Sequence, residues 1–341
     1  MFHRRSIALV GALVLLLLPV LTTGALARDP GSSANRARHD RVVAYWTAER
    51  IASARPRDMS IGRAPSTRRE PTPVATSTST GDQTPPAATI GSQWPNGVGK
   101  VYTATGRVLF KMGDYHYVCS GAVATDANTS RSIVLTAAHC AFDQATRSFA
   151  SYWVFIPEFD SRPDLWTCAN TTHGCWTAES LVVHNGYAGQ PGFDSTAKQH
   201  DWAFAVVRTG GHAGTRQLDT TVGSFPIAFT SYRAGTPVTA MGYPASGAYS
   251  PGSQLISCSG SLAMDSSNLS RTYRLPCDMN GGSSGGPWLT KFDTSGNRGT
   301  LSSVNSYTYS GLTAMHGPKF NSRTYATWSA ASRTTVSVVV R

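Results

Sequence analysis

Two adjacent serines lie in the glycine-rich stretch NGGSSGGPW, residues 280–288. A serine hydroxyl can attack a carbonyl carbon from a sharp, open turn, where small neighbours let the backbone approach the reacting atoms. Either Ser283 or Ser284 could be that nucleophile, and a glycine- and serine-rich loop without chemistry is the third interpretation. Other residues must decide, because a serine hydroxyl is a weak nucleophile unless a base removes its proton.

Histidine is the usual base for such a serine, and a carboxylate must orient it. His139 lies in the stretch VLTAAHC, and Asp201 precedes the apolar run in HDWAFAVV. Asp194, seven residues before Asp201, is a rival acid. The G-x-S-x-G elbow of α/β-hydrolases requires the order serine, acid, histidine, but only His316 follows the serine turn and the alternating βα pattern of that fold is missing. The residues therefore favour the chain order histidine, acid, serine, with His139 first, Asp201 or Asp194 second, and Ser283 or Ser284 third.

Short strands must position these groups. From about residue 98, runs rich in β-branched and aromatic residues alternate with Gly, Asp, Asn and Pro every 10–15 residues or so. This pattern predicts about a dozen strands and almost no amphipathic helix, and therefore an all-β sandwich or barrel. Some 240 residues are large for one sandwich and suit two barrels. His184 and His200 are interpreted as surface or loop residues.

The N-terminus has the pattern of a signal peptide over residues 1–27. Arg4 and Arg5 precede an apolar run over residues 7–21, and Ala25 and Ala27 form an A-x-A cleavage site. The run is shorter than the roughly 20 residues of a spanning helix, so export is favoured over an uncleaved anchor. Residues 28–90 are then interpreted as a removable pro-segment.

That pro-segment has two parts. Residues 34–56 carry apolar side chains at roughly helical spacing and end at Pro56, whereas residues 66–93 are rich in Pro, Thr, Ser and Gly and read as a linker. Residues 1–90 hold 12 Arg and no Lys against 6 acidic residues, within a net charge of +11 for the chain. An Arg-rich segment can bind nucleic acid, but no aromatic or zinc-type motif accompanies it, so a solvated segment is favoured.

An even number of cysteines in an exported chain favours disulfides, and six cysteines allow fifteen pairings. All of them follow the signal peptide: Cys119, Cys140, Cys168, Cys175, Cys258 and Cys277. Cys168, His173 and Cys175 lack a fourth zinc ligand at finger-like spacing. A small loop closed by Cys168 and Cys175 is therefore expected.

Two motifs, TAAHC around His139 and GSSGGP around Ser284, resemble those of the trypsin/chymotrypsin-like serine peptidases. The resemblance spans about residues 95–341. The stretch VVAYWTAER in the pro-segment resembles exported bacterial members of the glutamyl-endopeptidase-like branch. The resemblance implies a peptidase domain over residues 91–341, built from two packed antiparallel β-barrels, about 95–210 and 220–341, with the active site in the cleft between them.

The resemblance also implies roles. Ser284, which directly precedes Gly-Gly as in the family, would attack the scissile carbonyl, and His139 would take its proton. Asp201 would hold the imidazole, because the family places its acid directly before an apolar strand. The oxyanion hole would be formed by the backbone N–H groups of Gly282 and Ser284. Disulfides Cys119–Cys140, as in the family, and Cys258–Cys277 are expected.

The specificity (S1) pocket of this fold is lined by residues before the nucleophile and by the strand SSVNSYTY. Asp278 lies where trypsins carry the carboxylate that pairs with Lys or Arg, which would favour a basic P1 residue. Cys277 precedes it, whereas trypsins have the cysteine after it, so an apolar P1 residue beside Tyr307 is an equal alternative. Acidic P1 has little support, because Asn305 and Ser306 stand near the place where glutamate-specific relatives use a histidine.

One departure concerns activation. Animal trypsin-like enzymes usually have Asp directly before the nucleophile, to pair with a new N-terminal ammonium, and here that residue is Ser283. Removal of residues 28 to about 90 would instead unblock or release a domain already near its active form.

The sequence thus predicts a secreted serine endopeptidase made as a zymogen. It would act as a monomer on protein or peptide substrates and require no metal or organic cofactor. It would bind neither nucleic acid nor, after signal cleavage, a membrane. Two rivals are an inactive binding module of the same fold and an esterase using the same serine. The intact His139, Asp201 and Ser284 argue against the first, and their chain order argues against the second.

Overall fold

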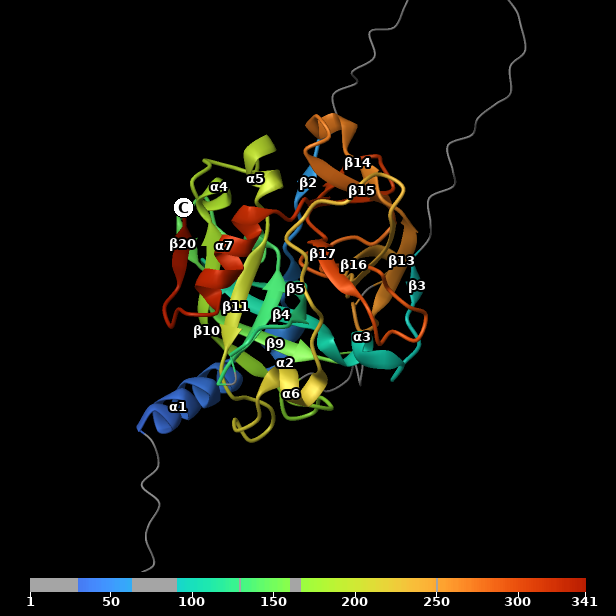
Figure 1. The fold of residues 1–341 in the computed structure, drawn as a ribbon. Helices are drawn as coiled ribbons and strands as arrows, with labels where there is room; N and C mark the ends of the chain where they lie inside the picture. Colours follow the sequence, from blue (N-terminus) through green and yellow to red (C-terminus); the bar gives the residue numbers. More distant parts are fainter. Residues whose placement is uncertain (1–29, 63–90, 129, 160–166, 250) are drawn as a thin grey trace, which may run out of the picture.

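The computed structural model describes residues 30–62, 91–128, 130–159, 167–249 and 251–341. The predicted signal peptide, and the linker up to residue 90, lie outside these ranges. Two β-structures lie side by side, one from the first half of the described chain and one from the second (Figure 1). The predicted all-β class is confirmed.

The first half is a closed antiparallel barrel in the order β5-β4-β9-β10-β11-β6, with β5 pairing β6 to close the circle. Its strands are β4 (Thr105–Met112), β5 (Tyr115–Ala124), β6 (Ser132–Thr136), β9 (Ser151–Pro157), β10 (Trp176–His184) and β11 (Ala203–Val207). Strands β6 and β11 are buried along their whole length, as their continuous apolar runs predict.

The second half combines a five-stranded sheet, β17-β16-β12-β13-β3, with a three-stranded sheet, β14-β15-β19. The strands are β3 (Ser92–Gln93), β12 (Pro237–Gly242), β13 (Ile256–Ser261), β14 (Ala263–Met264), β15 (Thr272–Pro276), β16 (Pro287–Thr290), β17 (Thr300–Val304) and β19 (Ala314–Pro318). Both sheets contribute side chains to one core around Trp288 and Tyr273. Ser92 and Gln93, expected in the linker, form an edge strand instead because they pair with β13.

Short strands and helices complete the chain. The short strands are β1 (Arg55–Pro56), β2 (Ser60–Ile61), β7 (Phe142–Asp143), β8 (Ser148–Phe149), β18 (Thr308–Tyr309) and β20 (Val338–Val340). The α-helices are α1 (Pro30–Tyr45), α2 (Ala48–Ala52), α3 (Gly99–Ala104), α4 (Asn185–Ala188), α5 (Ser195–Gln199), α6 (Leu218–Val222) and α7 (Ser322–Ala331). Single 3₁₀ turns are Ala138–Cys140, Gly247–Tyr249 and Ser266–Asn268. No helix within the described ranges is long and apolar enough to cross a membrane.

The helix expected over residues 34–56 is divided in two. The chain leaves helical geometry after Tyr45, and the side chain of Thr47 caps the next helix by accepting from the Arg50 N–H. Nor is this region solvated as expected, since Trp46 and Ile51 are buried against the first barrel. The Trp46 indole N–H donates to Tyr152 O at 2.7 Å, so the segment is docked by aromatic packing and a hydrogen bond.

The expected second barrel extends to residue 341, but the C-terminal residues pack against the first barrel instead. Strand β20 pairs parallel with β10, and helix α7 packs against β10 and β11. Helix α7 was not expected from the sequence. Asn321 and Thr324 form a capping box at its start, and the chain thereby closes over the first barrel (Figure 1).

All three expected disulfides are present: Cys119–Cys140, Cys168–Cys175 and Cys258–Cys277. The first joins β5 to the turn that carries His139, and the third spans from β13 to the residues after β15. Cys168–Cys175 closes a small loop, which agrees with the disulfide interpretation of this pair rather than the zinc one.

His184 and His200, interpreted from the sequence as surface or loop residues, are buried. Their rings stack with centroids 4.8 Å apart and lie against Trp202. The pKa of His184 is lowered to about 4 by burial, by His200 and by Arg323, and burial also lowers the pKa of His200. Both imidazoles are therefore neutral in the folded protein near pH 7.

Acid is expected to destabilise the fold through this pair. The unfolded chain binds a proton on His184 near pH 6.5 and the folded chain only near pH 4, so the stability contributed by the neutral ring is lost as pH falls between these values. The full difference would be about 3 kcal/mol, and partial solvent screening reduces it to about 1–2 kcal/mol. His184→Asn, which keeps an acceptor for the Gly186 N–H, should lose less Tm between pH 7 and pH 4. Equal losses in both proteins would contradict this.

Candidate active site

His139 lies in the 3₁₀ turn that follows β6, where Asp201 fixes it at two points. Its ring Nδ1 lies 2.8 Å from Asp201 Oδ2, and its backbone N–H donates to Asp201 Oδ1 at 2.9 Å. Both side chains are fully buried. Asp201 lies two residues before β11, which pairs with β6, so the sheet register brings the two residues together. The carboxylate thereby orients the ring and leaves Nε2 as its free nitrogen.

Ser284 lies on a turn between β15 and β16. Gly282 has φ +94° and Gly285 has φ +81°, a backbone region that suits residues without a Cβ atom. Ser120 holds this turn: its backbone N–H donates to Ser284 O at 2.7 Å, and its hydroxyl donates to Gly282 O at 2.9 Å. Ser120 directly follows Cys119 in β5. The Cys119–Cys140 disulfide therefore links β5, which holds the turn of Ser284, to the turn that carries His139.

The two serines of the turn have different environments. The hydroxyl of Ser283 is buried and donates to Asn280 O at 2.7 Å, inside the turn. Ser284 is 7% exposed and lines a pocket. The geometry thus leaves Ser284, and not Ser283, with a hydroxyl at the surface of a cavity.

Asp194 lies apart from this arrangement. Its carboxylate caps α5 by accepting from the backbone N–H groups of Thr196 and Ala197 at 2.9 and 2.7 Å. An Asp before a short helix is a common cap, so the local structure explains this residue without any chemistry.

Ser306 has a role that the sequence did not indicate. Its hydroxyl donates to Asp201 Oδ2 at 2.5 Å, so this carboxylate oxygen interacts with both Ser306 and His139. From the sequence, Ser306 is predicted only to line the pocket. A single serine between two strands carries no motif, and only the fold brings it within reach of a carboxylate 105 residues away.

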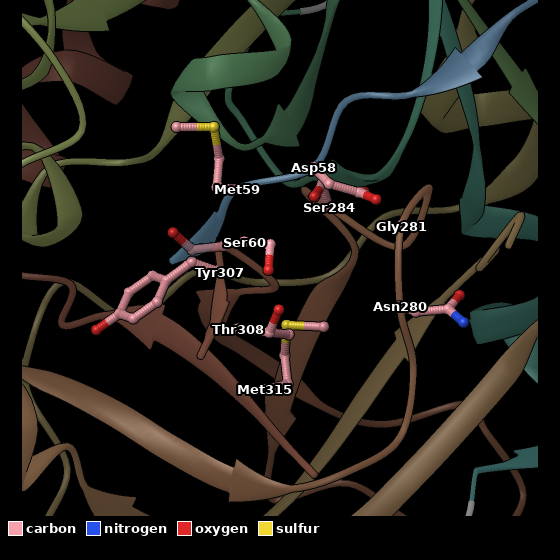
Figure 2. A pocket seen from close by; sticks show the side chains of 10 residues that line it. Asp58, Met59, Ser60, Asn280, Gly281, Ser284, Tyr307, Thr308 and Met315 are labelled. Atoms are coloured by element: carbon pink, nitrogen blue, oxygen red, sulfur yellow. The ribbon is translucent and has the colours of Figure 1, made fainter. Parts of the chain in front are cut away.

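The pocket beside Ser284 is shown in Figure 2. The second half of the chain contributes Asn280, Gly281, Ser284, Ser306, Tyr307, Thr308 and Met315. The N-terminal segment contributes Asp58, Met59 and Ser60. Two of the expected pocket residues, Ser306 and Tyr307, therefore line it. None of the lining residues from the second half carries a charge.

Asp278 and Asn305, the other two expected pocket residues, are not among the lining residues. Asp278 Oδ1 accepts from the backbone N–H of Gly91 at 2.5 Å and from the Tyr249 hydroxyl at 2.9 Å. Asn305 is fully buried behind the serine turn, where its side-chain N–H donates to Ser283 O at 3.0 Å.

Asp58 is the second residue whose place the sequence did not indicate. It lies next to Ser284 and Gly281 in the pocket (Figure 2). Burial raises the pKa of its carboxyl group, while the charge of His139 and a hydrogen bond from the Gly282 N–H lower it. No motif in the Arg-rich segment could have pointed to this position.

Comparison with known proteins agrees with this geometry. The trypsin-like peptidase domain family matches residues 119–295. No curated protein matches this chain. Among solved structures, the protease Anisep from Arthrobacter nicotinovorans is 32% identical with a TM-score of 0.59, covering 71% of this chain and 99% of its own.

Two further solved structures are similar. The thermostable serine protease AL20, from an extremophilic microorganism, is 37% identical with a TM-score of 0.58, covering 69% of this chain and 99% of its own. A Glu endopeptidase has a TM-score of 0.52 at 20% identity, covers 72% of this chain and 97% of its own, and supports the fold alone. The family match and these relatives establish that the chain belongs to the trypsin-like serine peptidases.

Proposed function

We propose that this chain is an exported serine endopeptidase, made as a precursor, whose catalytic residues are His139, Asp201 and Ser284. The observation that carries the proposal is the fully buried His139–Asp201 pair, which is held by two hydrogen bonds. The pair lies next to a serine on a turn flanked by glycines. In this arrangement the imidazole has one nitrogen committed to a carboxylate and the other available as a base.

The reaction follows from these positions. Ser284 Oγ attacks the scissile carbonyl carbon while His139 Nε2 takes the hydroxyl proton. The imidazolium, stabilised by Asp201, then gives the proton to the leaving amine, and the acyl-enzyme forms. Water activated by the same imidazole hydrolyses the ester. The backbone N–H groups of Gly282 and Ser284 would stabilise the oxyanion, and one such donor is worth roughly 3–4 kcal/mol.

A fluorophosphonate probe tests this function. Processed protein should form one adduct, mapped to Ser284 by peptide mass, and should hydrolyse peptides with a rate that falls as the adduct forms. Absence of any adduct would favour the inactive binding module. An adduct with ester hydrolysis but no peptide hydrolysis would favour the esterase.

Export and processing form part of the proposal. The signal pattern over residues 1–27 and the three disulfides support an extracellular location. Strand β3 is part of the second-half sheet, which supports a mature chain that retains Ser92 and Gln93. We also propose that the mature enzyme acts as a monomer on protein or peptide substrates, away from nucleic acid and membranes.

N-terminal sequencing of secreted, active protein should therefore find a start between about residues 85 and 91. Cleavage before β3 keeps the edge strand, whereas cleavage beyond it would remove backbone hydrogen bonds with β13. A few additional residues at this end should hardly change activity, because Ser283 offers no carboxylate for a new ammonium. Fully active secreted protein that begins at Arg28 would contradict the processing.

Specificity for an uncharged, apolar P1 side chain is part of the proposal as well. The lining residues from the second half are uncharged, and Tyr307 and Met315 supply apolar surface. A Lys or Glu side chain would lose hydration there without gaining a partner. Peptides with Leu or Met at P1 should therefore be cleaved with kcat/KM at least about tenfold above Lys and Glu peptides.

Asp278→Ser is the matched variant for this prediction. Because Asp278 bonds to Gly91 and Tyr249 outside the lining, the ratio of Leu to Lys cleavage should stay the same. A wild-type preference for Lys that disappears in Asp278→Ser would instead assign this carboxylate to the pocket.

A further inference from the structure

The N-terminal segment crosses the cleft of the proposed enzyme. Strand β1 pairs parallel with β5 of the first barrel, and β2 pairs parallel with β18 of the second half. Residues 57–59 connect them, and the backbone N–H of Thr308 donates to Met59 O at 3.2 Å. The linking residues thus pass directly over Ser284, at the junction of the two halves (Figures 1 and 2).

Backbone of this segment engages the nucleophile. The Ser284 hydroxyl donates to Arg57 O at 3.4 Å, a long hydrogen bond. His139 Nε2, which would have to take the proton of that hydroxyl, is buried without a hydrogen-bond partner among the described residues. The serine hydroxyl is therefore directed to the segment and not to its base.

The Asp58 carboxylate lies against the serine turn, beside the backbone that would form the oxyanion hole. Its two oxygens lie against Gly281, where a Cβ atom would collide with both of them, and the Gly282 N–H lowers the pKa of the carboxyl group. A carboxylate has the negative charge and the lone pairs that this donor is arranged to bind. The carbonyl of Arg57 meanwhile faces the Ser284 hydroxyl, so it receives no polarisation from the oxyanion donors and its peptide bond is not activated for cleavage.

Ionic and hydrogen-bonding contacts hold the segment in this position. Arg57 Nε donates to His139 O at 2.9 Å, and its Nη2 lies 3.6 Å from Asp143 Oδ1. Upstream, the Tyr45 hydroxyl bonds to His116 Nε2 at 2.8 Å and its ring stacks on Tyr152. The segment is thereby fixed to the first barrel on the N-terminal side of Asp58.

We propose that residues 57–61 are an intramolecular inhibitor that binds across the active-site cleft in an uncleavable arrangement, with Asp58 beside the oxyanion hole. The inference rests on the proposed function and specifies its regulation. Removal of the pro-segment would free Ser284, the Gly282 donor and the pocket in a single step, without a rearrangement of the barrels.

The test compares fluorophosphonate labelling of Ser284 in three full-length precursors, each followed by intact mass on molecules that still carry the segment. These are the wild type, Arg57→Ala/Asp58→Ala, and Asp40→Ala/Arg41→Ala. The last removes the same two charges from the exposed face of α1, away from the cleft. All three give the same mature chain after processing, so equal activities of the mature products show that each precursor folded.

The wild-type and α1-variant precursors should label about 100-fold more slowly than processed enzyme, as expected for two charge-assisted contacts that must break first. The Arg57→Ala/Asp58→Ala precursor should label within about tenfold of processed enzyme, since it loses both contacts. A wild-type precursor that labels as fast as processed enzyme, or a cleft variant that labels as slowly as wild type, would overturn the inhibitor. If processed enzyme itself forms no adduct at Ser284, the proposed function fails and this inference with it.

Discussion

Ser284→Ala should lower peptide turnover by about 10⁶-fold, as for the nucleophiles of other catalytic triads. The change removes the attacking oxygen and leaves the backbone bond between Ser120 N–H and Ser284 O intact, so the fold should persist. The measurement is kcat for a peptide substrate with the purified, processed protein, together with its Tm. Residual activity within about 100-fold of wild type would exclude Ser284 as the nucleophile.

Ser283→Ala is the matched control for that change. Its hydroxyl donates to Asn280 O inside the turn, so its removal should cost about 1 kcal/mol of stability and little activity. If Ser283→Ala were inactive and Ser284→Ala active, the assignment of the two serines would have to be exchanged.

Asp201→Asn should reduce kcat by about 10⁴-fold near pH 7, as the corresponding change does in other Ser-His-Asp enzymes. An asparagine of the same shape can donate to His139 Nδ1, which favours the imidazole tautomer that carries its proton on Nε2. That tautomer cannot accept the proton of Ser284. The loss should appear in kcat at saturating substrate, with the far-UV circular dichroism of the variant unchanged.

Asp194→Asn provides the comparison. Asparagine is as good a helix cap as aspartate, so α5 should remain capped and kcat should stay within about twofold of wild type. If Asp194→Asn lost as much activity as Asp201→Asn, the orienting carboxylate would not be assigned to Asp201 alone.

Much of the candidate site could be predicted from local sequence. The sharp turn around the serine could be predicted from Gly282 and Gly285, because residues with a Cβ atom disfavour such backbone conformations. Both glycines have positive φ in the fold. The strands beside His139 and Asp201 could be predicted because strands that are buried on both faces have continuous apolar runs. The disulfides followed from an even cysteine count and the family's pairing.

Other features depended on contacts between residues far apart in the chain, which local patterns do not encode. Asp278 precedes the nucleophile by the expected six residues, yet Gly91 and Tyr249 hold its carboxylate outside the pocket. Asp58 carries no motif and meets the serine turn only because β1 and β2 pair with strands of opposite halves. Sequence by itself determined which residues could perform the chemistry, because nucleophile, base and acid require particular side chains on particular turns. Only the tertiary structure decided which charged side chain faces the cleft and which segment covers the cleft. Both depend on how strands from distant parts of the chain pair with one another.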